Sequence, residues 1–479
     1  MASYRRHGVV TQHDLRRNRY LYLAFEVPAG TTSLQVRYQY DAGNLLDIGL
    51  FDPTAEPFPT RTGFRGWSGS KRREFFVASD AATPGYLPGP LAPGRWHVVL
   101  GLARILPSGC SYQVEIELSG SRRAALEPPS TTAVSAGVPG WYRGDLQSHS
   151  HHSDASGTLE DLVRAAGARG LDFLSVTDHN TTSHHRHLAE LSSPELLLIP
   201  GEEVTTYHGH ANVLGADGWI DFRLPADGDP AVLAAEAKAL GGLFSINHPK
   251  RLPNCIGCDW QYPVPEGADC FEAWHGPWPH RNWESLERYD ALLAEGRRLT
   301  LVGGSDRHQP GWPDRDPGIL QVGSPTTWLY LSELSLEAVL DALRAGRVFV
   351  SEGPDGPRLE ISAGGKTMGG AIDVPGGSKL KVKAKVSGAV GDRLVWTCAS
   401  GTVRDILITT NSFQDRWTWR PTGPFLRAQV VAETSLESAV RTVEDLERLG
   451  KLSATEATAI LKRPLLRALS NPIYLQYSD

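Results

Sequence analysis

The sequence predicts an α/β chain in which a barrel of alternating strands and helices lies between two mainly β regions. Three observations predict this class. Residues 20–118 hold short apolar runs separated by Gly, Pro and Asp, strand-like and helix-like runs alternate from Trp141, and short alternating runs return after Ser351. Regularly spaced short strands are typical of an antiparallel sandwich, whereas strand–helix alternation is typical of a barrel.

The length and composition allow several domains. A chain of 479 residues with 41% hydrophobic residues can build two to four cores. The predicted division is an N-terminal β-sandwich over 1–120, a linker over 121–140, a barrel over 141–352, and a β-rich C-terminal domain over 353–479 with a helical insertion at about 435–469. The linker is predicted from Pro128-Pro129 and the Ser, Thr, Ala and Gly around it.

Individual elements follow from local patterns. In the first region, alternation predicts strands at 20–25, 33–38, 96–100 and 112–116. In the second, a capping box from Thr158 to Asp161 predicts a helix to Ala168 with Gly170 as its stop, followed by a strand at 171–176. Further strands are expected at 195–199, 211–214, 243–246, 270–274, 299–302 and 327–331, with helices near 230–240 and 283–295. About seven strands with intervening helices predict a closed barrel.

The third region returns to β-structure. Strands are expected at 380–386, 425–430 and 473–475. Between the last two, a helix over 435–449 and a second helix opening at Ser453 predict a helical hairpin.

Charge and hydropathy exclude some functions. The net charge of -6 and the lack of a basic stripe argue against nucleic-acid binding. No apolar run approaches 18 residues and no leader pattern follows the N-terminus, so we expect a cytoplasmic protein that does not associate with membranes. The five cysteines, including the lone Cys255-x-x-Cys258 pair, are expected to be reduced thiols.

The histidines indicate a metal centre. Thirteen of sixteen lie between His149 and His308, most of them beside acidic residues after predicted strands. Imidazole and carboxylate groups suit zinc, manganese or iron, and the C-terminal ends of barrel strands meet at one mouth. We therefore expect separate clusters to converge there.

The order of these clusters resembles a known superfamily. The motifs are Gly144-Asp145-Leu146-x-x-His149-x-x-x-Ser153-Asp154, Thr177-Asp178-His179-Asn180, Pro200-Gly201-x-Glu203, Gly209-His210-x-Asn212, Asn247-His248-Pro249 and Gly304-Ser305-Asp306-x-His308. Together they resemble the polymerase-and-histidinol-phosphatase (PHP) superfamily over about residues 141–352. Tyr142–Leu146, residues 209–215, the Glu272–Trp278 segment and the closing 471–474 are similar to its CehA/McbA-type metallohydrolases.

The resemblance implies a distorted (β/α)7 TIM-like barrel that holds two or three divalent ions (Zn, Mn or Fe). It implies three ligand sets, in which Glu203 bridges the first two: His149, Glu203 and Asp306; Glu203, His210 and His248; and Asp154, His179 and His308. Glu202 is the competing acid, but the family's acid lies three residues after the proline, which selects Glu203. The family's first motif has a histidine where this chain has Gln147, so Gln147 is expected to be a weaker, neutral ligand of the first ion.

The expected activity is hydrolysis of a small-molecule ester, either a phosphoester or an aryl carbamate or carboxylic ester. A metal-bound water, ionised to hydroxide, would be the nucleophile, because ions about 3.5 to 4 Å apart activate water and stabilise the departing oxygen. Asp178 would either bond an imidazole or cap the next turn, and His184 is a candidate substrate contact. Surface placement is favoured for each of the other histidines near the mouth, namely His151, His152, His185, His187, His208 and His275.

An alternative from another class is a non-catalytic carbohydrate- or surface-binding protein with a degenerate barrel. The observation that favours it is Gln147, which replaces a histidine of the family's first motif. The sequence does not determine the oligomeric state and is compatible with a homo-oligomer.

Overall fold

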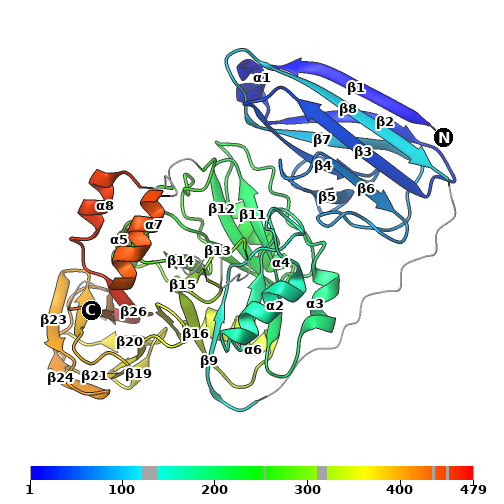
Figure 1. Ribbon diagram of the computed structural model, residues 1–479. Helices are drawn as coiled ribbons and strands as arrows, with labels where there is room; N and C mark the ends of the chain where they lie inside the picture. Colours follow the sequence, from blue (N-terminus) through cyan, green and yellow to red (C-terminus); the bar gives the residue numbers. More distant parts are fainter. Residues whose placement is uncertain are drawn as a thin grey trace.

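The protein is described from a computed structural model, which covers residues 2–120, 137–252, 255–309, 321–433, 437–448 and 452–477. Figure 1 shows the N-terminal strands, in blue, at one end of the molecule and the C-terminal strands, in yellow and orange, at the other. The mixed α/β class predicted from the sequence is confirmed. Most of the predicted linker, 121–136, lies outside the described residues.

The N-terminal region is built from two four-stranded sheets, ordered β1-β8-β3-β6 and β2-β7-β4-β5. Alternate residues of the strands point inward, so that Val36, Trp96 and Ile116 are fully buried in a shared core. Its elements are β1 (Ser3–Val10), α1 (Gln12–Arg17), β2 (Tyr20–Val27), β3 (Ser33–Tyr40), β4 (Leu45–Phe51), β5 (Phe64–Trp67), β6 (Glu74–Ala78), β7 (Gly94–Arg104) and β8 (Cys110–Ser119).

The central region carries the strand–helix alternation. Its elements are β9 (Gly140–Asp145), α2 (Leu159–Ala168), β10 (Phe173–Val176), α3 (His185–Leu191), β11 (Leu197–Thr206), β12 (Gly209–Leu214), α4 (Ala231–Ala239), β13 (Leu243–Ile246), β14 (Cys270–His275), α5 (Asn282–Ala294), β15 (Thr300–Gly304), β16 (Thr326–Leu331), α6 (Leu336–Arg344) and β17 (Val348–Ser351). The capping box of α2 is present at Thr158 and Asp161. No sequence pattern had predicted α3 or α6.

The central strands form one continuous sheet in the order β15-β14-β13-β12-β11-β10-β9-β16-β17. Strands β9, β10 and β11 run parallel, as do β13, β14 and β15, while β12 is antiparallel to both of its neighbours. Beyond the ends of β9 and β15, Asp306 N–H donates to the Gln147 carbonyl at 3.0 Å and His149 N–H donates to the Arg307 carbonyl at 2.9 Å. Among the described residues no strand ladder joins β15 to β9, and the closed seven-stranded barrel stays a prediction.

The C-terminal region extends this sheet. Strand β26 (Leu466–Ser470) pairs with β17 on one side and with β25 (Phe425–Val431) on the other. The sheet continues from β25 through β22 (Arg393–Cys398) to β23 (Gly401–Leu407). A separate sheet, β19-β18-β21-β24, covers the same core. The remaining elements are β18 (Arg358–Ala363), β19 (Lys366–Thr367), β20 (Ala371–Val374), β21 (Leu380–Ser387), β24 (Ser412–Trp419), α7 (Glu437–Arg448), α8 (Ala454–Ile460) and β27 (Ile473–Tyr477).

The predicted helical insertion at about 435–469 is too long at its C-terminal end. Helices α7 and α8 occupy its first part, but α8 ends at Ile460 and most of β26 follows within the same range. Every residue of β26 except Arg467 is buried, so this strand lacks the alternation that marks a half-exposed strand in a sequence.

The N-terminal sandwich packs directly against the central region. Trp219 stacks on Phe64 with ring centroids 4.0 Å apart and planes 5° apart. Tyr207, in the turn between β11 and β12, donates to Asp47 Oδ2 at 2.6 Å. These contacts belong to one hydrophobic core that spans both regions, so the sandwich is fixed beside the β11–β12 hairpin.

Two further expectations can be compared with the structure. Cys255 and Cys258 are joined as a disulfide, so the expectation of reduced thiols is wrong for this pair; their Cα atoms lie 5.6 Å apart, within bonding reach. Cys110, Cys270 and Cys398 are free and buried. Within the described residues, no helix combines the length and apolar character needed to cross a bilayer.

Candidate metal centre

The motif histidines and acids gather at one edge of the central sheet. Gln147 and His149 follow β9, His179 follows β10, His248 follows β13, and Asp306 and His308 follow β15. Because these strands are mutually parallel within each half of the sheet, their C-terminal ends meet at the same edge. Two residues differ from the expected placement after strands: Glu203 lies inside β11, and His210 lies near the start of the antiparallel β12.

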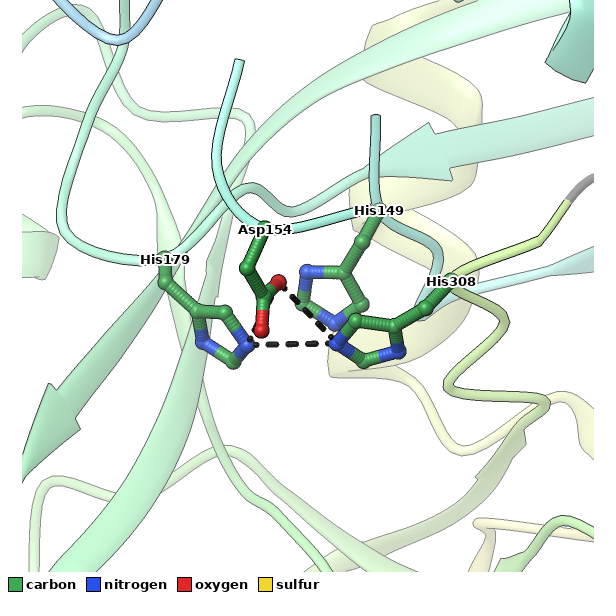
Figure 2. Close-up of side chains that lie close together, drawn as sticks. All are labelled: His149, Asp154, His179 and His308. Carbon is green, nitrogen blue, oxygen red and sulfur yellow. Dashed lines mark hydrogen bonds and ion pairs between the residues drawn. The ribbon is translucent and has the colours of Figure 1, made fainter. Parts of the chain in front are cut away.

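One ligand group consists of His149, Asp154, His179 and His308 (Figure 2). The Nε2 atoms of His179 and His308 face each other at 3.4 Å, and Asp154 Oδ1 lies 3.2 Å from His308 Nε2 and 3.6 Å from His179 Nε2. The His149 ring stacks on both imidazoles, with centroids 4.3 and 4.2 Å away. Asp154 is about half exposed, which places this group at the entrance of the site.

A second group is centred on Glu203, which is fully buried. Its Oε1 atom lies 3.3 Å from His210 Nδ1 and 3.2 Å from His248 Nε2. Its Oε2 atom lies 3.3 Å from His149 Nε2 and 3.0 Å from His179 Nδ1. Both oxygens of one carboxylate therefore face imidazoles from different strands, as expected for an acid shared between ions.

Asp306 connects the remaining groups. Its Oδ1 atom lies 2.9 Å from His149 Nε2, and its Oδ2 atom lies 3.0 Å from His275 Nε2. Among the described residues, the donor atoms of His149, Glu203 and Asp306 lie within 4.8 Å of one another, and so do those of His248, His275 and Asp306. The first of these sets matches the one implied by the family resemblance.

Neighbouring groups orient several imidazoles. The Asp306 carbonyl accepts from His308 Nδ1 at 2.9 Å, and the Cys258 carbonyl accepts from His248 Nδ1 at 2.7 Å. Since a carbonyl can only accept, both Nδ1 atoms carry hydrogen, and Nε2 is the atom of each ring that can bind an ion once it is deprotonated. His179 Nδ1 pairs with Thr205 Oγ1 at 2.7 Å.

The donor set fits divalent ions. Glu203 Oε2, His210 Nε2, His149 Nδ1 and Gln147 Oε1 are buried without a hydrogen-bond partner among the described residues. Leaving such groups unpaired costs free energy, and a bound cation would offset part of that cost at the Glu203 carboxylate, whose oxygens face the imidazoles of the cluster. Nitrogen and oxygen donors in this proportion suit zinc, manganese or iron.

The backbone is strained at the same place. Asn180, His248 and Asp306 have φ values of 54°, 29° and 54°, in the left-handed region that non-glycine residues rarely adopt. Such conformations cost roughly 1–3 kcal/mol each and cluster at functional sites. Here they turn the chain sharply after β10, β13 and β15, and so direct His248 and Asp306 toward the centre.

Gln147 lies among the ligands. Its Nε2 atom donates to Glu203 Oε1 at 3.1 Å and to Asp306 Oδ1 at 3.3 Å. In this orientation the amide is a hydrogen-bond donor that spaces the two carboxylates.

The metal-free site holds extra protons on two imidazoles. Burial opposes a charge on His179, but Glu203 and Asp154 outweigh it and raise the pKa of His179 to about 9. Burial likewise opposes a charge on His308, yet Asp154 and Asp306 raise its pKa to about 10. Both imidazoles are therefore protonated in the metal-free protein at pH 8.

Ion binding should consequently release protons. An imidazole binds a metal only when its ligating nitrogen is deprotonated, so we expect about two protons per chain to be released at pH 8, and the affinity to rise between pH 7 and 10. Isothermal titration calorimetry in two buffers of different ionisation enthalpy measures this number. His308→Ala should reduce it by about one. Release near zero in the unmodified protein would contradict the charged state of these imidazoles.

Asp178 organises the loop that carries two of the ligands. Its Oδ1 atom accepts from Ser150 N–H at 2.8 Å and Ser153 Oγ at 2.6 Å, and its Oδ2 atom accepts from Ser150 Oγ at 2.6 Å. Burial alone would raise the pKa of Asp178, but His184 and His152 hold it well below its usual value. Asp178 therefore fixes the 150–153 loop between His149 and Asp154.

Asp178→Asn should weaken metal binding about 10- to 100-fold, the usual effect of losing a partner that orients ligands. A zinc titration against a competing chelator measures the change. The matched control is Asp172→Asn, at the opposite end of β10, where Asp172 accepts from Arg143 N–H. Equal affinities for the two variants would rule out an orienting role for Asp178.

Other histidines lie deeper than expected. Surface placement is wrong for His152 and His275, which are 6% and 3% exposed. His152 pairs with Ser183 Oγ at 2.8 Å. His184, the candidate substrate contact, is fully buried between Asp178 and the carbonyls of Val176 and Gly201, and does not line the cavity.

A cavity of about 700 Å³ opens over the ligands. Its floor includes Glu203, His210 and Asp306, and the N-terminal sandwich provides the opposite wall, which contains Asp47, Trp67, Lys71 and Arg104. Lys71 Nζ donates to the Asp154 carbonyl at 2.6 Å, so the sandwich contacts the ligand loop directly. Sequence analysis missed this wall, because no motif links residues 45–104 to the histidine clusters.

Comparisons with known proteins find distant similarity to solved structures. No protein-family model matches the chain, and no curated protein sequence matches it. Among solved structures, the chain is similar to a two-domain protein from Bacteroides vulgatus ATCC 8482 that contains a predicted PHP-like metal-dependent phosphoesterase, with 19% identity, coverage of 63% of this chain and 94% of that one, and a TM-score of 0.36.

Proposed function

We propose that this protein is a metal-dependent hydrolase of small-molecule esters, with phosphoesters as the first substrate class and aryl carbamates or carboxylic esters as the second. The observation that carries the proposal is the convergence of overlapping imidazole and carboxylate groups on Glu203 and Asp306 at the floor of the cavity. The motif resemblance to CehA/McbA-type metallohydrolases supports the second class.

Different residues would bind the ions and keep the ligands in position. Glu203, Asp306 and the histidines around them would hold two or three divalent ions, with Asp154, His179 and His308 at the entrance. Ions bound there would supply Lewis-acid activation of water and of the ester. Gln147 and Asp178 would keep the carboxylates and the 150–153 loop in place, as their hydrogen bonds indicate.

The cavity favours a small substrate. A volume of about 700 Å³ lies within the range of roughly 300–1,000 Å³ common for small-molecule sites. Lys71 and Arg104 place positive charge along the wall opposite the ligands, which suits an anionic ester.

A substrate panel tests the proposal. Protein loaded with Mn²⁺ or Zn²⁺ is assayed on bis(p-nitrophenyl) phosphate and on 1-naphthyl N-methylcarbamate, before and after chelation. We expect turnover of at least one substrate, lost on chelation and regained with metal. No turnover of either, together with less than about one bound ion per chain, would contradict the proposal and favour a binding protein with a degenerate centre.

A further inference from the structure

His275 is a buried imidazole held in a fixed position beside the ligands. It is the last residue of β14 and is 3% exposed. Its backbone N–H donates to Asn282 Oδ1 at 2.8 Å, and its carbonyl accepts from Lys250 Nζ at 3.1 Å and Asn282 Nδ2 at 3.0 Å. These bonds fix the main chain, so the ring faces Asp306 from a rigid support.

The ring of His275 is aimed at the centre. Its Nε2 atom lies 3.0 Å from Asp306 Oδ2, and its centroid lies 4.9 Å from that of His248. Asp306 is thus placed between two imidazoles, with His149 on Oδ1 and His275 on Oδ2. None of the three ligand sets implied by the family motifs uses His275.

Gln147 leaves this part of the centre short of one imidazole. The motif pattern has a histidine at this position, but the amide of Gln147 donates to Glu203 and Asp306 as a neutral group. An amide oxygen is also a weaker ligand for zinc than an imidazole nitrogen. Another nitrogen ligand beside Asp306 would compensate for the imidazole that Gln147 does not provide.

We propose that His275 supplies an imidazole to the centre, so that His248, His275 and Asp306 hold one divalent ion in place of the implied set of Glu203, His210 and His248; the inference rests on the proposed metal centre. His248 can serve only one of these sets, because its Nδ1 atom donates to the Cys258 carbonyl and its Nε2 atom has a single lone pair. The donor atoms of His248, His275 and Asp306 lie within 4.8 Å of one another. A tetrahedral ion with bonds of about 2.1 Å needs donor atoms about 3.4 Å apart, so small side-chain rotations suffice. Gln147 keeps the role of spacing the two carboxylates.

Metal content tests the proposal without an assay of activity. The unmodified protein, His275→Ala and the control His280→Ala are saturated with Zn²⁺, passed through a desalting column and analysed for zinc per chain. His280 is buried near His275, with ring centroids 5.5 Å apart, but belongs to none of the ligand groups. We expect His275→Ala to retain about one ion fewer than the other two.

A second pair of variants keeps the test valid if His275→Ala folds poorly. His275→Asn keeps a polar side chain, and circular dichroism of every variant reports folding. The double variant Gln147→His/His275→Ala should regain the lost ion, because the imidazole returns on the other side of Asp306. X-ray absorption at the zinc edge of the unmodified protein should show more imidazole per ion than in His275→Asn.

The outcomes separate the two proposals. Full zinc content in both folded His275 variants, with unchanged imidazole number, would overturn the role of His275 and leave the proposed function intact. Absence of bound zinc from the unmodified protein would overturn both.

Discussion

Replacing Glu203 by glutamine should reduce ester hydrolysis by about 10³-fold or more and lower the metal content of the chain. Both Glu203 oxygens face imidazoles, and an amide can neither carry the charge nor bridge ions in the same way. A loss of about 4 kcal/mol of transition-state stabilisation corresponds to this factor. Rates and bound metal are measured on the same preparation, because the proposed metal centre requires both to fall.

The neighbouring acid is a matched control. Glu202 is also buried in β11, but its Oε2 atom accepts from Ile220 N–H at 2.8 Å and it contacts none of the ligands. Burial raises the pKa of Glu202 well above its usual value and so favours the neutral acid, which glutamine imitates. Glu202→Gln should therefore keep the metal and the rate. The reverse result for the two variants would show that Glu202 is the ligand.

Trp219→Ala should destabilise the fold by about 3–5 kcal/mol, because a large buried indole leaves a cavity. Trp219 stacks on Phe64 of the sandwich, and its Nε1 atom donates to the Asn180 carbonyl at 3.3 Å, beside His179. The substitution loosens both the packing of the sandwich and the chain next to a ligand. A thermal melt of the metal-free protein should show a fall of several degrees.

A half-buried tryptophan provides the comparison. Trp417 lies on β24, is not among the residues that line the cavity, and is only partly buried. Trp417→Ala should cost less than half as much and leave metal binding unchanged. A melting temperature for Trp219→Ala equal to that of the unmodified protein would show that the sandwich does not depend on this contact.

Local patterns predicted much of the fold. The capping box at Thr158 marked the start of α2, and the apolar residues Leu243, Phe244 and Ile246 marked β13 at its observed bounds. Such signals act over a few residues. Strand β26 was hidden because its partners β17 and β25 come from earlier parts of the chain, and such pairing leaves no local sign.

Part of the candidate site could be predicted, because its motifs are also local sequence patterns. Motif order named residues that the structure brings together at one sheet edge, including His149, His179 and His308. His275 occupies a variable position within the Glu272–Trp278 segment, and only the observed register of β14 turns it toward Asp306. Lys71 and Trp67 reach the cavity through packing of the sandwich, which depends on contacts such as Tyr207 with Asp47 rather than on sequence spacing.

Metal titration of activity tests the central claim most directly. The chelated protein is given Zn²⁺ or Mn²⁺ in steps, and bound metal and hydrolysis of bis(p-nitrophenyl) phosphate and the naphthyl carbamate are measured at each step. We expect no activity without metal and a rate that rises with bound ions until about two or three per chain are present. Undiminished hydrolysis by the chelated protein, or binding of less than about one ion per chain, would contradict the claim.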